Sequence, residues 1–169
     1  VKSDGKATFS EIKIYEGTYV NQTFTVDSNN PTQKFILPNS GIDTDLISVI
    51  VRDTAGSTVS RKFDMFESLF DVTKSTRAFF LQEISQERYE LMFGDGIFGV
   101  ALENSNFVEA SYITCNGSDA NNITSFNFIG NLVSNTGATI SSGVSVLTTE
   151  EASGGGKAIE SVESVKKYA

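Results

Sequence analysis

Short runs of alternating apolar and polar residues, separated by glycine-containing turns, fill the chain from Phe79 to Gly117. In residues 88–93, Tyr89, Leu91 and Phe93 alternate with charged or polar neighbours. A period of two places alternate side chains on opposite faces, which is typical of a half-buried β-strand. This pattern, with the glycine-containing turns, predicts a β-hairpin followed by a third strand.

The tripeptide Gly94-Asp95-Gly96 interrupts this alternation. Asp-Gly supplies the positive φ angles that a tight hairpin turn requires. We therefore predict that Tyr89–Phe93 pairs antiparallel with Ile97–Ala101. Gly99 inside the second run indicates a bulge or a close backbone approach. Phe107–Thr114 predicts a third strand.

Other segments also have strand character. Ser10–Gly17 alternates charged and apolar residues and ends at a glycine. Runs rich in β-branched and aromatic residues, or in apolar residues bounded by turn residues, predict further strands. They lie at 18–26, 34–38, 46–52, 57–63, 78–84 and 124–129. The expected fold is mainly β, with antiparallel, sandwich-like sheets and one C-terminal α-helix.

That helix is predicted at Lys157–Tyr168. Ile159, Val162 and Val165 form a narrow apolar stripe, and the distribution of charge along the segment suits the helix dipole. A helix of this length is marginal alone in water, so we expect its stripe to be covered by a partner. Gly154-Gly155-Gly156 precedes it as a flexible or sharply turning joint.

The stretch Asn121–Thr149 contains 29 residues without a charge, of which 18 are Asn, Ser, Thr or Gly. Its alternating positions predict weakly amphipathic β-structure. Sheet edges are normally protected by charge or proline. The stretch therefore packs within the chain, contacts a partner, or is a loop that orders on assembly.

Three blocks emerge along the chain: residues 1–63, residues 64–130 with the predicted hairpin, and residues 131–169 with the uncharged segment, joint and helix. They could also form one continuous domain. We expect the chain to be a fragment of a longer protein.

The net charge is −8, and no Lys or Arg occurs from Tyr89 through Gly156. Nucleic acid and anionic membranes require positive charge, so neither is an expected partner. The acidic half suits a basic protein surface, or it serves only solubility.

Enzyme chemistry has little support in the composition. The chain has no His and one cysteine, Cys115, which we expect to be a buried thiol. The commonest general base and zinc ligand are therefore missing. We expect no enzyme, cofactor or metal, and a hairpin turn rather than a cation site at Asp95. Weaker candidates are a metal group of Asp43, Asp45 and Asp53, and carboxylates at Glu83, Glu87, Glu90 and Glu109.

Two motifs occur together in order. The first combines Phe93, Gly94, Asp95, Gly96, Phe98 and Gly99; the second combines Gly155, Gly156, Glu160 and Ser161, followed by Val165, Lys166 and Ala169. Together they resemble the baseplate J-like family, the wedge proteins of contractile phage tails such as those of T-even-type phages. The resemblance spans roughly residues 35–169.

This resemblance implies a structural subunit of the tail baseplate in the virion, made late in infection and assembled in the bacterial cytoplasm. It implies self-association, contacts with other wedge proteins and rearrangement on contraction. Ile159, Val162 and Val165 are the interface candidates. The alternative is an extracellular β-sandwich that binds carbohydrate or a host receptor through an exposed aromatic platform from the strands of Phe79, Phe80 or Tyr112.

Overall fold

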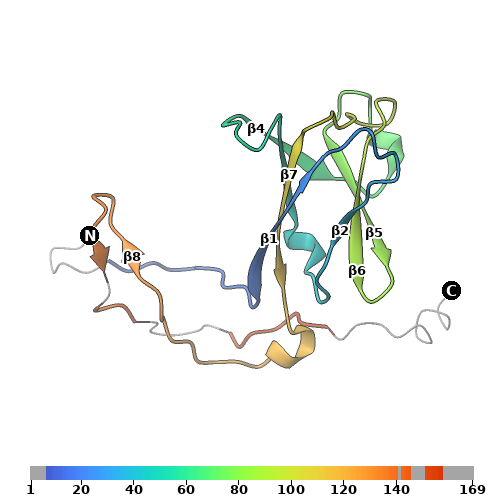
Figure 1. Ribbon diagram of the computed structural model, residues 1–169. Coiled ribbons are helices and arrows are strands. Elements are labelled where there is room, and N and C mark those ends of the chain that lie inside the picture. The colour runs from blue at the N-terminus through green and yellow to red at the C-terminus, as the bar shows by residue number, and fades with distance from the viewer. Residues whose placement is uncertain (1–6, 141, 146–150, 158–169) are drawn as a thin grey trace, which may run out of the picture. The chain divides into compact units, whose positions relative to one another are not determined.

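The computed structural model describes residues 7–140, 142–145 and 151–157, and the chain divides into two compact units, Val1–Cys115 and Asn116–Ala169 (Figure 1). The first unit contains one seven-stranded sheet in the order β1-β7-β3-β4-β5-β6-β2. Its strands are β1 (Thr18–Thr25), β2 (Phe35–Leu37), β3 (Ser48–Arg52), β4 (Ser60–Met65), β5 (Ala78–Ile84), β6 (Arg88–Phe93) and β7 (Phe107–Thr114). The expected mainly β fold is thus confirmed.

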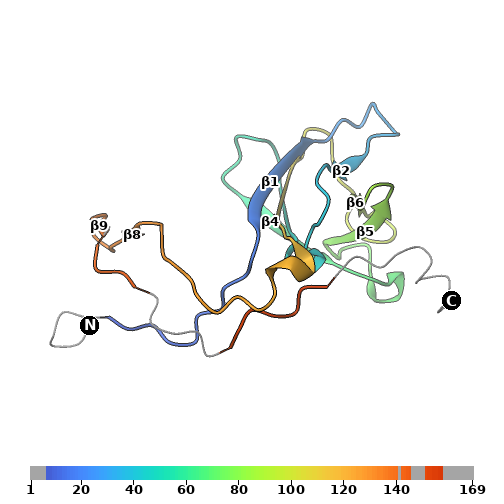
Figure 2. The same ribbon diagram turned by 90° about the horizontal axis from the view of Figure 1, so that it is seen from below.

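The sheet curls until its two outer strands, β1 and β2, approach each other, so that it is nearly closed (Figure 2). The rings of Phe24 on β1 and Phe35 on β2 meet edge to face, with centroids 5.6 Å apart. Gln33 reinforces this closure: its Nε2 donates to the Thr25 carbonyl at 2.7 Å, and its Oε1 accepts from Asp27 N at 2.9 Å. One nearly closed sheet therefore replaces the expected sandwich-like pair.

The core lies inside this curled sheet. On β7, the alternate residues Val108, Ala110 and Tyr112 are buried, as the period of two requires. The Tyr112 hydroxyl donates to Asn39 Oδ1 at 2.6 Å, which satisfies its polar atom at the core boundary. Edge-to-face contacts join four rings across the interior, those of Phe24, Phe35, Phe93 and Phe63. Phe93, the first residue of the first motif, is therefore a packing residue.

The predicted hairpin around Gly94-Asp95-Gly96 is wrong. β6 pairs with β5 instead, with Phe79 opposite Phe93 and Ile84 opposite Arg88, through the turn at residues 85–87. Residues 97–101 form no strand beyond an isolated bridge between Gly94 and Ala101. The backbone N–H groups of this segment bond within the loop and to a second loop, as described below, so they are not available to β6.

Two further segments differ from expectation. Residues 10–17 and 124–129 are described and form no strand. In the second unit, the described part of the uncharged stretch contains one short hairpin, β8 (Leu132–Val133) with β9 (Thr139–Ile140). The expected blocks 1–63 and 64–130 both contribute strands to the sheet of the first unit.

Helical structure in the described residues is restricted to three 3-10 turns: η1 (Thr44–Leu46), η2 (Leu69–Asp71) and η3 (Gly117–Ala120). The described residues contain no α-helix. No helical segment among them is long and apolar enough to cross a membrane. The predicted C-terminal helix falls, apart from Lys157, on residues 158–169, which lie outside the described part of the chain.

Candidate interaction surface

The loop that follows β6 is held by its own aspartate. Asp95 Oδ1 accepts hydrogen bonds from the backbone N–H groups of Ile97 and Phe98, both at 2.9 Å. These two bonds lower the pKa of the Asp95 carboxyl group from its ordinary value of 3.8, and the bond from Phe98 has the larger effect. Asp95 therefore organises a turn, as an Asx side chain does in many loops.

The same loop is tied to the loop that precedes β5. Gly99 N donates to the Thr73 carbonyl at 3.1 Å, and Val100 N donates to the Thr76 carbonyl at 2.9 Å. Thr73 N in turn donates to Thr76 Oγ1 at 3.0 Å, which closes a local turn. Two loops far apart in sequence thus form one hydrogen-bonded unit, which we call the loop pair (residues 66–77 and 94–101).

The loop pair exposes large apolar side chains. Phe70 is 100% exposed and Leu69 51% exposed on the η2 turn, which Ser68 caps by accepting from Phe70 N at 3.2 Å. Ile97 and Phe98 are 69% and 48% exposed on the facing loop. All four lie close in sequence to the bonds that join the loops. Large apolar side chains exposed on a hydrogen-bonded loop surface suit a protein–protein contact site.

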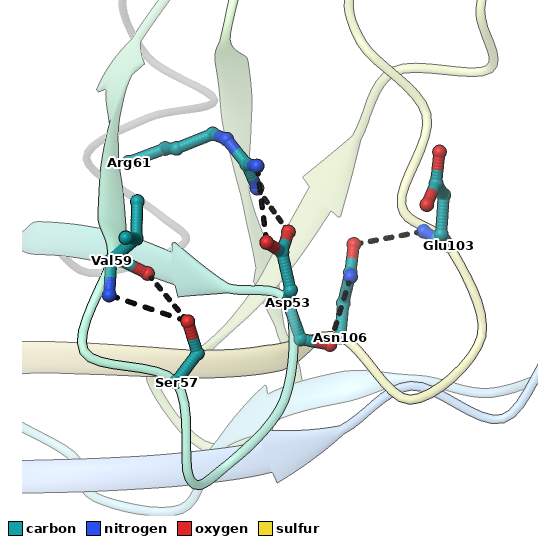
Figure 3. A network of polar contacts seen from close by, with 6 residues as sticks. All are labelled: Asp53, Ser57, Val59, Arg61, Glu103 and Asn106. Carbon is teal, nitrogen blue, oxygen red and sulfur yellow. Dashed lines mark hydrogen bonds and ion pairs between the residues drawn. The ribbon is translucent and has the colours of Figure 1, made fainter.

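A polar network lies where β3 ends and where β4 and β7 begin (Figure 3). Arg61 of β4 makes a bidentate contact with Asp53, which lowers the pKa of the Asp53 carboxyl and raises that of the arginine, chiefly through the side-chain hydrogen bonds. The buried Asn106 donates to the Asp53 carbonyl at 3.4 Å and accepts from Glu103 N at 2.9 Å. The network therefore joins three segments of backbone, at Asp53, Arg61 and residues 103–106.

The weaker site candidates do not gather. Asp43 Oδ1 accepts from Asp45 N at 3.1 Å, which caps η1, while Asp53 is paired with Arg61. In the described residues no group of three metal-ligating side chains is present. Glu90 is paired with Lys34 and Glu109 with Arg52, both at 2.8 Å, while Glu83 and Glu87 are exposed near Tyr89.

The aromatic platform expected for carbohydrate binding is not formed by the side chains named for it. Phe79 and Tyr112 are 1% exposed and belong to the core, and Phe80 is half-buried. Cys115 is also half-buried rather than fully buried, and its thiol lies 3.5 Å from the Gly41 carbonyl oxygen.

In the second unit, the second motif is bound to the turn around η3. Asn121 Nδ2 donates to the Gly156 carbonyl at 2.8 Å, and Gly156 N donates to Asn121 Oδ1 at 3.0 Å. Ser153 N donates to the Ile123 carbonyl at 2.9 Å, and Asn122 N donates to the Ser153 carbonyl at 2.7 Å. Gly156 is thus fixed to its neighbours, whereas Glu160, Ser161, Ile159, Val162 and Val165 lie outside the described residues.

Sequence reasoning identified Phe98 and the glycines of the loop pair but missed Leu69, Phe70, Thr73 and Thr76. An apolar pair on a Ser-initiated turn, followed by Thr-x-x-Thr, was the available local signal. No family model matches this sequence, and no curated protein matches it.

Proposed function

We propose that this chain is a structural part of a phage tail baseplate wedge, of the kind represented by the large wedge protein of T-even-type phages. Its role is to hold neighbouring subunits in the ring around the tail hub. The loop pair is the observation that carries this proposal, because the first motif builds one of its two loops and that loop presents Ile97 and Phe98 to solvent.

The loop pair has the properties of a docking surface. Bonds from Gly99 and Val100 to the opposite loop fix its backbone before binding, so little conformational entropy is lost when a partner arrives. Fully burying one Phe or Ile side chain contributes about 1.5–3 kcal/mol. Phe70 and Ile97, the two most exposed of the four, are therefore expected to contribute most.

Rearrangement on contraction belongs to the same proposal. A switch between two arrangements requires interfaces of nearly balanced free energy. The candidates are the uncharged stretch and residues 154–156. Asn121 fixes Gly156 on one side, so a joint there would turn at Gly154 and Gly155.

Electron microscopy tests the proposed function. Antibodies raised against the chain should label the distal end of contractile tails in particles from the virus that encodes it. Antibody label on the capsid would contradict the proposal. So would unlabelled tails in particles that are shown by mass spectrometry to contain the chain.

A second candidate function, saccharide binding, has one specific observation in its favour. Tyr19 on β1 is 66% exposed, and its hydroxyl donates to Ser111 Oγ at 2.9 Å on the neighbouring strand. Beside it, Asn21 Nδ2 donates to Glu109 Oε1 at 2.7 Å, and Glu109 also pairs with Arg52. An exposed ring next to fixed planar polar groups suits a sugar. Glycan-array binding that Tyr19→Ala abolishes would support this function, and an array without binding would remove it.

A further inference from the structure

β1 is an outer strand of the sheet, and only one of its two sides is paired. The order β1-β7-β3-β4-β5-β6-β2 leaves β1 and β2 as the two outer strands among the described residues. β1 pairs with β7 over its full length, from Thr18 opposite Thr114 to Thr25 opposite Phe107. A further strand could therefore pair only with the other side of β1, which we call its outer side.

Two observations show which residues of β1 point to the outer side. Val26 bonds to the β7 side, where it donates to the Asn106 carbonyl at 2.8 Å and accepts from Ser105 N at 2.9 Å. The Thr25 carbonyl instead accepts from Gln33 Nε2 at 2.7 Å. Because successive residues of a strand point in opposite directions, the even-numbered residues of β1 bond to β7 and the odd-numbered residues point to the outer side.

The neighbouring strand β7 gives the same directions. The Ile113 carbonyl accepts from Asp43 N at 2.9 Å, on the β3 side of β7. The odd-numbered residues of β7 therefore face β3, and its even-numbered residues face β1. In the β1–β7 register, even-numbered residues lie opposite even-numbered residues, as Gln22 does with Ala110. Both strands thus assign the odd-numbered residues of β1 to the outer side.

The outer side presents a row of backbone donors. The N–H groups of Tyr19, Asn21 and Thr23 point there, and none of them has an acceptor among the described residues. The Thr23 carbonyl accepts from Gln22 Nε2 at 3.2 Å, which is a bond within the strand itself. A row of unpaired N–H and carbonyl groups along an extended strand is a template for pairing with another chain.

The two outer strands differ in how they are protected. Sheet edges are normally guarded by charge, by proline or by being short. β2 has three residues, and Lys34 precedes and Pro38 follows the strand. β1 has eight residues, none of which is charged or a proline. Gln33 already occupies the end at Thr25, so the open part is Tyr19–Thr23, which we call the β1 edge.

We propose that the β1 edge binds a single extended segment of another protein by β-strand addition. Backbone hydrogen bonds supply the affinity in this mode of recognition, and alternate side chains supply the specificity. Val20 and Phe24 are half-buried on the inner face of β1, so the inward side chains of the segment are apolar. Because β1 offers no opposite charge, the segment is uncharged where it pairs.

A strand that already belongs to a folded sheet does not suit the β1 edge. The sheet curls so that β2 approaches β1, and the rings of Phe24 and Phe35 meet with centroids 5.6 Å apart. A second copy that offered its own β1 would bring its own β2 toward the same space. The segment is therefore a terminus or a linker of its protein. This inference goes beyond the proposed function, because it rests on hydrogen-bond directions in β1 alone.

A synthetic peptide tests the proposal with the purified full chain. The probe is a short peptide of alternating valine and threonine with a lysine at each end. Calorimetry should show saturable binding. Hydrogen exchange at the amides of Tyr19, Asn21 and Thr23 should slow about tenfold or more in the complex, because these amides gain acceptors. Exchange at Val133 of the second unit is the control and should not change.

Two backbone-methylated forms of the peptide test the mode of binding. One is N-methylated at every valine and the other at every threonine. Because alternate N–H groups of a strand point in opposite directions, only one set faces β1, and only one form should lose binding. With valine inward, loss on threonine methylation indicates antiparallel pairing and loss on valine methylation indicates parallel pairing. Equal binding of both forms, or equal loss, would overturn the proposal.

Proline variants test the directions within the chain. Thr23→Pro removes an N–H group that points to the outer side, so it should keep the melting temperature within a few degrees and weaken peptide binding about tenfold or more. Gln22→Pro removes an N–H group directed at β7 and should lower the melting temperature far more. A Thr23→Pro variant that melts as low as Gln22→Pro would show that the assigned directions are wrong and would overturn the proposal.

The remaining outcomes concern other occupants of the β1 edge. An absence of peptide binding would overturn the proposal. Slow exchange at Tyr19, Asn21 and Thr23 in the monomeric chain without peptide would overturn it as well, because the chain would then cover its own edge. A dimer in sedimentation equilibrium that Thr23→Pro dissociates would assign the edge to a second copy and would also overturn it.

Discussion

Gly94 and Gly99 approach each other so closely that a Cβ atom on Gly94 would lie 2.6 Å from Gly99 Cα. Real Cβ atoms do not approach backbone atoms to this distance, so position 94 requires glycine. The close contact folds the segment after β6 back on itself and brings Gly99 and Val100 to the carbonyls of Thr73 and Thr76. The shape of the loop pair therefore depends on a missing side chain.

Gly94→Ala should lower the free energy of unfolding by about 1–3 kcal/mol, the usual cost of forcing extra atoms into a packed site. Gly56→Ala is the matched control, since a Cβ atom there would meet nothing within 4 Å. Urea denaturation measures both variants. Equal stability of the two would show that the loop relaxes without cost and would remove the close-approach argument.

Gly96→Val should cost about 1 kcal/mol or more, for a different reason. Gly96 has a φ of +89°, and a β-branched residue resists positive φ. Space is not the limit, because the nearest atom to an added Cβ is Ala101 Cβ at 3.9 Å. Gly96→Asn should therefore be milder, since Asn tolerates this region better. An unchanged melting temperature for Gly96→Val would contradict the prediction.

Asp95→Ala should destabilise the chain in a pH-dependent way. The pKa of Asp95 is lowered in the folded state, so its contribution to stability is full above the ordinary value of 3.8 and is lost as the pH falls through the folded pKa. The difference in melting temperature between wild type and Asp95→Ala should shrink from pH 7 to pH 3. Asp95→Asn keeps an acceptor oxygen but no charge, so its difference from Asp95→Ala should not change with pH. A wild-type advantage that grows at pH 3 would refute the assignment.

Asn121→Ala should loosen the second unit locally. It removes both hydrogen bonds to Gly156, while the bonds around Ser153 stay in place. Hydrogen exchange should show faster exchange at Gly156 and Ser153 and unchanged protection in β7. Asn135→Ala, on the exposed β8–β9 turn, is the control. Equal protection in both variants would mean that Asn121 does not hold the segment.

Much of the sheet was accessible from sequence because its strands alternate. β6 and β7 carry apolar residues at every second position, and this local pattern suffices to place them. Their pairing was less accessible. The turn between β5 and β6 contains no glycine, although Gln86 and Glu87 both have positive φ. Because rules for turn residues depend on glycine, they do not predict this turn.

The candidate surface was harder to predict for a physical reason. Asp95-Gly96 has the composition of a hairpin turn, but the Asp95 side chain binds Ile97 N and Phe98 N, which removes their N–H groups from strand pairing. The next two N–H groups, those of Gly99 and Val100, donate to the carbonyls of Thr73 and Thr76 on the opposite loop. Contacts between segments more than 20 residues apart leave no mark on local periodicity.

Replacing Phe70 and Ile97 together with serine tests the central claim that the loop pair joins this chain to its neighbours in a tail baseplate. Both side chains are exposed, so the purified variant should keep its melting temperature within a few degrees. In the virus that encodes the chain, quantitative mass spectrometry of purified tails should then show the protein reduced by tenfold or more, and micrographs should show incomplete baseplates. Complete baseplates that carry the folded variant at wild-type amounts would contradict the account.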